Sequence, residues 1–507
     1  MGSLSLFLDF LYNIPLIQAI LAATLVFLCI YYGISQLRGL PPGPRGIPIL
    51  GYWPFLRQEN AHLQVQELRD KYGEVFSFTA TGHLYICLNS MKVIKEAHVG
   101  KSECFEDRFS DYSLLTLSFE EAVSIVNGES WKVQRKFFQQ KFKEYGMLAI
   151  KENFSGAVYD TLKDTVEEVR ELKGEPTSIT EILTVKCSSI IRRILFNDQG
   201  ITEEELKELN REYGPVLASM THKNLLLMGN IARYLVFPFM PSYWAMLRSH
   251  NRIQNILRNV IVRHKANFDD TQVMDIIDCF HKEKKDREMK GDPSAKYFTD
   301  KALLSSVYQF VTDGVLTIAY FIAMFLEKLV ECPEEQDKIY EELMDVLGPD
   351  RQPTMEDRSS LPYTTAFLYE VIRCTDFFVM FPSLKCTKET TLHGYRIPKG
   401  AITLIMGWCA NHDPNVYEEP DSFNPSRFVT VPGKQKTQLP ILFGIGKRAC
   451  MGEAFAMIQA FLFVATIVKN FHLTKPEGAD NSFNVLLAGG LQICAHARTQ
   501  DAQGKAK

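Results

Sequence analysis

Helical periodicity runs through almost the whole chain after residue 60 and constrains the fold more than any other feature. Apolar residues recur there at intervals of three and four, a spacing typical of helices that bury one face. The clearest segments are residues 158–172, 202–212, 250–267, 302–330, 333–347 and 454–470, and short patterns at 74–79, 84–88 and 401–405 indicate strands. No further linker or repeat divides this region, so we predict one mainly α domain with small β-sheets over residues 53–507. Because a single core of that size is unusual, we expect a large buried cofactor.

Composition and charge narrow the classes of protein that this chain can represent. Its 507 residues are 46% hydrophobic, enough for a large core, and the formal net charge of -4 creates no field that attracts nucleic acid. The 11 cysteines form no C-x-x-C pair and lack the density of a secreted disulfide framework. We therefore expect no nucleic-acid partner and a reducing compartment around the body of the protein.

Residues 1–38 have the pattern of a membrane anchor. The nearly apolar run 16–34 lies within a longer uncharged stretch and would span roughly 28 Å as a helix, close to the hydrocarbon thickness of a bilayer. Only Asp9 is charged before this run, whereas Arg38 and Arg45 follow it, so the positive-inside rule places the body in the cytosol. The rival interpretation, a cleaved signal peptide, is disfavoured because the run is too long and lacks a basic start.

Two segments that contain prolines each allow two interpretations. Residues 39–52 begin Gly39-Leu-Pro-Pro-Gly-Pro-Arg-Gly-Ile-Pro48, which forbids helix and predicts a stiff extended linker. Its composition fits a generic connection equally well, but its place beside the anchor favours a hinge. The apolar stretch Tyr234–Trp244 is interrupted by prolines and too short to span a bilayer, so it either dips into the membrane surface or belongs to the core.

A glycine-rich segment, Phe443-Gly-Ile-Gly-Lys-Arg-Ala-Cys-Met-Gly452, comes directly before the last long helical pattern. At the start of a helix, Cys450 has free backbone N–H groups and the positive end of the helix dipole nearby, and both favour a thiolate. The glycines allow the backbone to pass close to a flat group, and Arg448 can pair with an anion. Taken alone, a buried structural cysteine in a tight turn is the alternative.

This segment resembles the F-x-x-G-x-R-x-C-x-G signature of cytochromes P-450 at every fixed position. The resemblance implies the cytochrome P-450 fold and haem b, with Cys450 as the iron ligand and Phe443, Gly446 and Arg448 beside the cofactor. It also implies a microsomal type of enzyme, anchored by one pass in the endoplasmic reticulum membrane and supplied with electrons by an NADPH-dependent reductase.

Two more motifs resemble the same family. Glu370 and Arg373 lie three residues apart on a predicted helix, and Arg427 stands in a Pro-Ser-Arg-Phe segment. The resemblance implies that these three residues form a buried charge cluster behind the haem. Trp131 and Arg135 resemble the W-x-x-x-R motif, which implies that they bind a haem propionate.

One position departs from the family pattern. Leu384 occupies a place where many relatives carry a His or Arg for a propionate. Lys385 is the nearest substitute, but its side chain would point elsewhere if this segment is a strand.

The oxygen chemistry depends on the segment Asp313-Gly-Val-Leu-Thr317, aligned with the family pattern A/G-G-x-D/E-T. The usual acid is replaced by Leu316, while Asp313 stands four residues before Thr317 and is expected to share its side of the helix. In the interpretation we favour, Asp313 and Thr317 form a proton relay in a monooxygenase. In the alternative, the lost acid marks a dehydratase or isomerase that acts without dioxygen on an oxime or a peroxide.

Partners follow from less specific patterns. A basic face for docking an acidic reductase is predicted from Lys132, Lys136, Lys141, Lys143, Lys434, Lys436, Lys447 and Arg448, although many soluble helices are equally basic. A hydrophobic pocket for a lipophilic small molecule is suggested by Phe310, Phe377, Phe378 and Met380, which a core would need as well.

Overall fold

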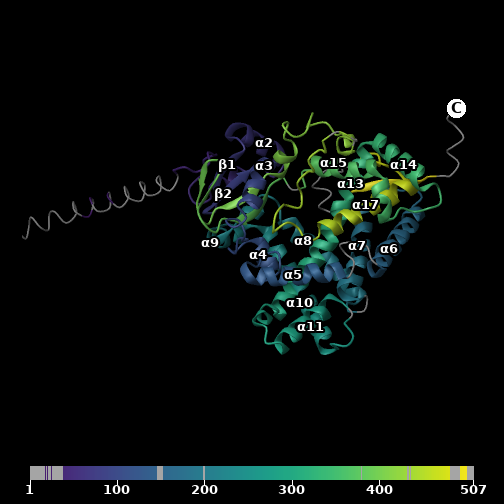
Figure 1. Ribbon diagram of the computed structural model, residues 1–507, viewed down its shortest axis with the longest axis horizontal. Coiled ribbons are helices and arrows are strands. Elements are labelled where there is room, and N and C mark those ends of the chain that lie inside the picture. The colour runs from purple at the N-terminus through teal and green to yellow at the C-terminus, as the bar shows by residue number, and fades with distance from the viewer. Residues whose placement is uncertain are drawn as a thin grey trace, which may run out of the picture.

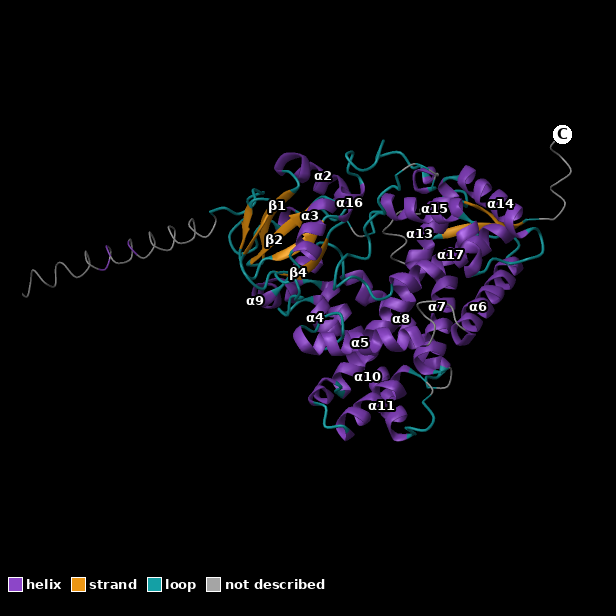
Figure 2. Cartoon of the chain, viewed as in Figure 1, coloured by secondary structure: helices purple, strands orange, loops and turns teal. Residues whose placement is uncertain are grey.

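The computed structural model describes residues 38–144, 152–197, 200–273, 275–377, 379–430, 433, 435–479 and 491–498, with the isolated positions 18, 20 and 24. Helices dominate this part of the chain, and the strands form small sheets (Figure 2). The prediction of a mainly α protein with minor sheets is therefore confirmed. The predicted anchor lies almost entirely outside the described residues.

The larger helices include all six segments predicted from periodicity. They are α2 (Ala61–Tyr72), α5 (Gly128–Glu144), α6 (Glu152–Glu171), α7 (Ile179–Phe196), α8 (Glu203–Ser219), α10 (Pro241–Ala266), α11 (Ile276–Met289), α12 (Asp300–Thr312), α13 (Ile318–Glu331), α14 (Pro333–Leu347), α15 (Pro362–Cys374) and α17 (Glu453–Asn470). Helix α10 begins earlier than periodicity predicts, because Pro241 occupies its first turn, where a missing N–H carries no penalty.

The four-stranded sheet lies at one end of the molecule (Figures 1 and 2). Its order is β1 (Val75–Ala80), β2 (His83–Leu88), β7 (Ile402–Ile405) and β4 (Phe381–Lys385), with β2 and β7 parallel and the other pairs antiparallel. The two smaller sheets are β3 (Thr177–Ser178), β9 (Gln492–Ala497) and β8 (Phe471–Thr474), and the hairpin of β5 (Thr390–Leu392) and β6 (Tyr395–Ile397).

The proline-rich segment 39–52 packs against this sheet. Ser77 on β1 donates through its backbone N–H to the Pro42 carbonyl (2.7 Å) and through its hydroxyl to the Pro41 carbonyl (2.7 Å). A Cβ at Gly43 would lie 1.6 Å from the Ser77 carbonyl oxygen, so only glycine permits this approach. The segment is thus attached to the body along part of its length.

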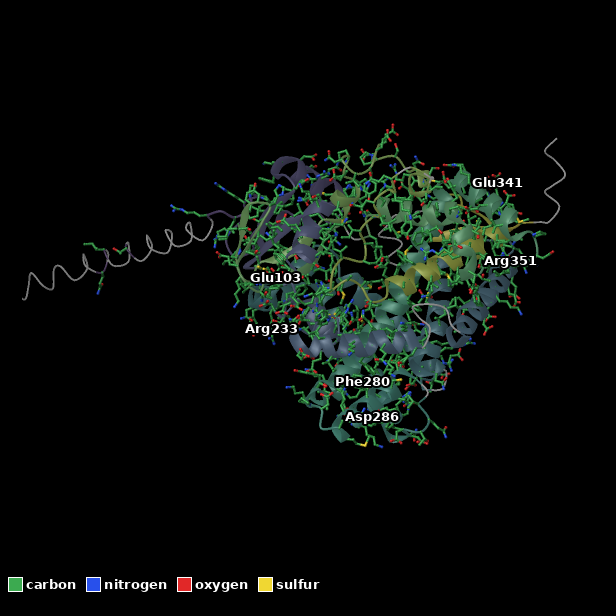
Figure 3. All side chains as sticks on the ribbon, in the orientation of Figure 1. Glu103, Arg233, Phe280, Asp286, Glu341 and Arg351 are labelled. Carbon is green, nitrogen blue, oxygen red and sulfur yellow. The ribbon has the colours of Figure 1, made fainter. Side chains whose placement is uncertain are left out.

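The core is built around two apolar helices. The continuous helical run Asp300–Glu331 and α17 are long and apolar enough to cross a membrane, yet most of each is buried inside the described part of the protein. A helix that is apolar on all sides is typical of a protein core. Phe280 on α11, labelled in Figure 3, extends the core toward α5 through ring contacts with Phe298 (4.9 Å) and Phe137 (5.8 Å).

A π-helical turn, η7 (Asp313–Thr317), joins α12 to α13. A Cβ at Gly314 would lie 2.3 Å from Ile191 Cδ1, so the glycine lets α7 pack closely against this turn. Such single π turns are frequent at functional sites. Here the turn coincides with the segment predicted to carry the oxygen chemistry.

Neither interpretation of Tyr234–Trp244 holds for the whole stretch. Phe237 is fully buried and stacks on Tyr243 with ring centroids 5.1 Å apart, so part of the stretch belongs to the core. Four large side chains remain exposed: Tyr234, Leu235, Phe239 and Trp244. Pro238 and Pro241 lie in the first turns of η5 (Phe237–Phe239) and α10, so the prolines mark the starts of helical turns within the stretch.

Candidate active site

Cys450 closes a tight loop directly before α17. Its backbone N–H donates to the Phe443 carbonyl (2.9 Å), and the backbone N–H of Gly452 donates to its sulfur. Gly446 has φ +80°, and a Cβ there would lie 2.4 Å from the His98 carbonyl oxygen. The glycine at 446 therefore permits both the left-handed turn and the close contact with the segment that carries His98.

The Cys450 thiol and the Asp313 carboxyl lie close enough for the charge of Asp313 to affect the thiol. Each side chain keeps accessible surface. Burial nevertheless raises the pKa of the Cys450 thiol to about 11, to which the charge of Asp313 contributes, and burial raises the pKa of Asp313 to about 7. A metal cation at the sulfur would favour the thiolate through its own charge.

Three arginines surround the cysteine loop. Arg135 donates to the Ala449 carbonyl (2.8 Å), Arg448 donates to the Val126 carbonyl (2.9 Å), and Arg108 donates to the Arg448 carbonyl (3.3 Å). Within the described part of the chain, none of the three has a carboxylate within ion-pair distance. This arginine cluster therefore carries positive charge that carbonyl oxygens alone do not balance.

The electrostatics of the arginine cluster indicate that it binds an anion. Burial and the nearby Arg108 and Arg135 lower the pKa of Arg448 to about 9, while burial and Arg135 lower that of Arg108 to about 10. The Nη1 atom of Arg448 is buried, and the described residues offer it no hydrogen-bond partner. Because an unpaired buried charge is costly, carboxylates such as haem propionates fit this site.

Trp131 lies beside this arginine cluster, as the W-x-x-x-R motif predicts. Its ring centroid is 4.4 Å from the Arg448 guanidinium and 5.9 Å from that of Arg135. Phe443 contacts Phe321 on α13, with ring centroids 5.7 Å apart. The fold thus brings Trp131 to the loop that contains Phe443 and Cys450, although more than 300 residues separate Trp131 from Phe443.

Arg108 is a residue that sequence reasoning missed. Leu384 is buried, and Lys385 forms an ion pair with Asp111 (3.0 Å), so this lysine does not replace the missing His or Arg. Arg108 instead donates to the carbonyl of Ser383, one residue before Leu384 (2.7 Å). No local pattern around Arg108 indicates this role, because only tertiary packing brings it to β4.

The predicted charge cluster has the expected contacts. Arg373 donates twice to the Glu370 carboxylate, at 2.8 Å each, and Arg427 donates to the same carboxylate at 3.1 Å. The backbone N–H of Asn424 adds a fourth bond at 2.7 Å. Carbonyl oxygens of Asn411, Pro420 and Ser422 accept from Arg373, so the buried charges are paired and hydrogen-bonded.

In the π turn, Asp313 and Thr317 differ in burial from the residues between them. Both keep accessible surface, whereas Gly314, Val315 and Leu316 between them are buried. Gln309 donates through Nε2 to Asp313 Oδ2 at 3.2 Å. The position of Gln309, four residues before Asp313 on the same helical run, is the sequence signal that could have identified it.

The predicted docking and pocket residues are more scattered. Exposed lysines pair weakly with neighbouring acids in Lys132–Glu129 (3.8 Å) and Lys447–Glu106 (3.8 Å), and Lys434 lies outside the described residues. Phe310 packs edge-on against Phe138 and Phe142, with ring centroids 4.8 and 5.0 Å away, so its role is core packing. Met380 is buried, Phe377 is partly buried, and Phe378 is outside the described residues.

A cysteine loop before a buried helix, beside three arginines with no carboxylate at ion-pair distance among the described residues, has the features of a haem-thiolate protein. The chain matches the sequence model of the family Cytochrome P450 across residues 41–490. It is 27% identical to cytochrome P450 2F3 of Capra hircus over 495 residues, which cover 95% of this chain and 99% of that protein. It is also 28% identical to cytochrome P450 2B19 of Mus musculus over 479 residues (93% and 95%) and 27% identical to cytochrome P450 18a1 of Drosophila melanogaster over 461 residues (87% and 83%).

The chain therefore belongs to the cytochrome P450 family. It is an oxidoreductase of the haem-thiolate monooxygenase class, and its cofactor is haem b. The resemblance inferred from the cysteine segment is confirmed.

Proposed function

We propose that this enzyme inserts one oxygen atom from dioxygen into a lipophilic small molecule, with Cys450 as the iron ligand and an NADPH-dependent reductase as the electron donor. The observation that carries the proposal is the position of the Cys450 sulfur. It accepts a hydrogen bond from the Gly452 N–H and lies within reach of the charge of Asp313. Hydrogen bonds to a thiolate and a protein-enclosed site are the usual means of tuning such an iron centre.

The residues that would hold haem b lie in the Cys450 loop or contact it. Cys450 would ligate the iron, Arg108, Arg135 and Arg448 would bind the propionates, and Trp131, Phe443 and Gly446 would border the ring. Bound haem with a thiolate ligand supplies dioxygen activation and favours cleavage of the O–O bond. The orphaned Nη1 of Arg448 and the absence of a carboxylate partner for the described arginines support this assignment.

Asp313 and Thr317 are the proposed proton donors. A pKa of about 7 lets Asp313 hold and release a proton near neutral pH, which is the condition for efficient general acid catalysis. The Thr317 hydroxyl, on the same side of the helix, can pass the proton onward. Leu316 is buried in the core, so the replacement of the usual acid leaves Asp313 as the acid of this turn. This arrangement favours the monooxygenase over the dioxygen-independent alternative.

Location and partners follow the same proposal. Residues 1–38 would anchor the enzyme in the endoplasmic reticulum membrane by a single pass, with the catalytic domain in the cytosol and residues 39–52 as the hinge. The exposed group Tyr234, Leu235, Phe239 and Trp244 would add a second, weaker membrane contact. The lysines around the cysteine loop and α5 would dock the reductase by charge complementarity.

Spectroscopy of a cysteine variant tests this proposal. The reduced, carbon monoxide-bound enzyme should show the strongly red-shifted Soret band of a thiolate-ligated iron, and Cys450→Ala should abolish it. The partly buried Cys494 offers a control, since Cys494→Ala should leave the band unchanged. A Cys450→Ala protein that keeps the band would overturn the ligand assignment. Deletion of residues 1–38 should move the protein from membranes to soluble fractions with the band intact.

A further inference from the structure

A hydrogen-bonded chain runs from a loop outside the long helix to the Asp313 carboxyl. The Ser124 hydroxyl donates to Gln309 Oε1 at 2.8 Å, and Gln309 Nε2 donates to Asp313 Oδ2 at 3.2 Å. We propose that Ser124 and Gln309 are positioning residues that hold the Asp313 carboxyl in the orientation from which it delivers protons. This inference rests on the proposed function, because it concerns the acid that the proposal assigns.

When Asp313 is ionised, the donor pattern favours one orientation of the Gln309 amide. A carboxylate only accepts hydrogen bonds, so Asp313 must face the NH2 group of the amide. The amide oxygen then faces Ser124, whose hydroxyl satisfies it. If the amide flipped, its oxygen would face the carboxylate and the bond to Asp313 would be lost, although the Ser124 hydroxyl could still accept from the NH2 group. The carboxylate therefore fixes the orientation of the Gln309 side chain.

The bond from Gln309 makes the two carboxyl oxygens of Asp313 different. Oδ2 is held by Gln309, while Oδ1 has no hydrogen-bond partner within the part of the chain that the structure describes. Oδ1 is therefore the atom that can hold the transferable proton. The bond from Gln309 restricts rotation of the carboxyl group, which keeps Oδ1 directed the same way in each turnover.

Ser124 is itself held in place by the segment 119–127, which connects two parts of the site. On one side, Phe119 packs edge-on against Tyr308 of α12 with ring centroids 5.4 Å apart, and Glu120 pairs with Lys301 (2.6 Å). On the other side, the Val126 carbonyl and the Asn127 side chain accept from Arg448, at 2.9 and 3.1 Å. The same short segment thus contacts both the helix that carries Asp313 and the arginine cluster.

Variants of Gln309 and Ser124 test the proposal in the full-length, haem-loaded enzyme. Gln309→Leu should lower the product formed per NADPH consumed by about tenfold, the scale expected for loss of one hydrogen bond to a charged group. Haem content and the carbon monoxide spectrum should not change. Ser124→Ala should act in the same direction but less strongly, whereas Ser124→Thr, which keeps the hydroxyl, should behave like the parent enzyme.

An infrared measurement provides a readout that does not depend on turnover. The carbonyl band of protonated Asp313, obtained below pH 7 as the difference between the parent protein and Asp313→Asn, should shift to higher frequency in Gln309→Leu because its oxygen loses a hydrogen bond. A matched control is Gln140→Leu, which removes an equivalent bond from Gln140 to Glu144 (2.8 Å) on the exposed face of α5. That control should change neither the carbonyl band of Asp313 nor the product formed per NADPH consumed.

Combination with Asp313→Ala decides whether Gln309 acts through Asp313. Gln309→Leu should have no additional effect on coupling in the Asp313→Ala background, because the residue it positions is gone. Additive losses, or an unshifted carbonyl band in Gln309→Leu, would overturn the proposal. If Asp313→Ala uncouples the enzyme and Gln309→Leu does not, this inference fails while the proposed function stands. Turnover without NADPH would instead refute the proposed function itself.

Discussion

Arg373 forms a two-pronged ion pair with Glu370 in which both N···O distances are 2.8 Å and neither side chain is exposed. The two residues lie one helical turn apart on α15, a spacing that usually gives a weak surface pair. Here this face of α15 is buried, so the remaining charge and hydrogen-bonding groups of the pair also need partners. Arg427 and the Asn424 N–H complete it from a segment that is more than 50 residues away in sequence.

Removal of the Glu370 charge should therefore strongly destabilise the fold. We expect Glu370→Gln to lower the free energy of unfolding by about 3–5 kcal/mol, because two arginines lose their counter-charge. Glu129→Gln, which breaks the exposed Glu129–Lys132 pair of the same spacing, should change it by less than about 1 kcal/mol. Urea titration of the Soret band measures both values, and equal effects would contradict the assigned burial.

Gly446 should tolerate no side chain. A Cβ would lie 2.4 Å from the His98 carbonyl, in addition to the penalty of about 1–2 kcal/mol for a left-handed residue. We expect Gly446→Ala to lower haem content as well as stability. Gly394→Ala is the matched control, since Gly394 has φ +82° but no atom within 4 Å of its Cβ position. The control should show only the conformational penalty, and haem content measured by pyridine haemochrome should distinguish the two.

Arg108 should contribute to haem retention although no motif contains it. Arg108→Leu is expected to speed haem loss by about tenfold or more, the scale of one charge-assisted hydrogen bond. Lys385→Met serves as the control, because Lys385 is committed to Asp111. Transfer of haem to excess apomyoglobin measures the rate. If Lys385→Met has the larger effect, the lysine rather than Arg108 is the substitute for the missing His or Arg at position 384.

Asp313 and Thr317 should affect the product formed per NADPH consumed, and should not affect the binding of haem or substrate. Asp313→Ala is expected to lower product per NADPH by ~10²–10⁴, the range for a positioned acid or base, with hydrogen peroxide released instead. Thr317→Ala should act in the same direction, and the double variant should be no worse than the stronger single one. Product, peroxide and nucleotide are measured together. Anaerobic turnover without nucleotide would show that the dioxygen-independent alternative is correct.

Glu327 should make the fold less stable as pH rises. Burial, with Glu331 and Asp376 nearby, raises its pKa to about 8, against an ordinary value of 4.5. The folded state therefore binds this proton more tightly than the unfolded state, so stability decreases with pH between about 4.5 and 8. Glu327→Gln should flatten that slope and stabilise the protein at pH 8, whereas the exposed Glu341→Gln should not. Urea midpoints measured across this pH range check the prediction.

Local sequence determined the elements of this protein and the chemistry of its cysteine loop. Apolar spacing identified the helices because each helix buries one face or all of them. This burial requires apolar residues at intervals of three and four along the chain. The cysteine loop could be predicted from sequence because Gly446, Arg448 and Cys450 lie within one short segment. The contacts among Glu370, Arg373 and Arg427 follow the same logic only in part, since their burial depends on packing.

Tertiary structure alone decided which distant residues complete the site. Arg108 reaches the cysteine loop across 340 residues of sequence, and Ser124 reaches Gln309 across 185. Lys385, adjacent to position 384, instead forms an ion pair with Asp111. Such partners depend on how helices and sheet pack against one another, and no local pattern records that arrangement. An arginine or a serine in a loop has the same local preferences wherever it is finally placed, so the physical reason is that long-range packing, not propensity, selects its partner.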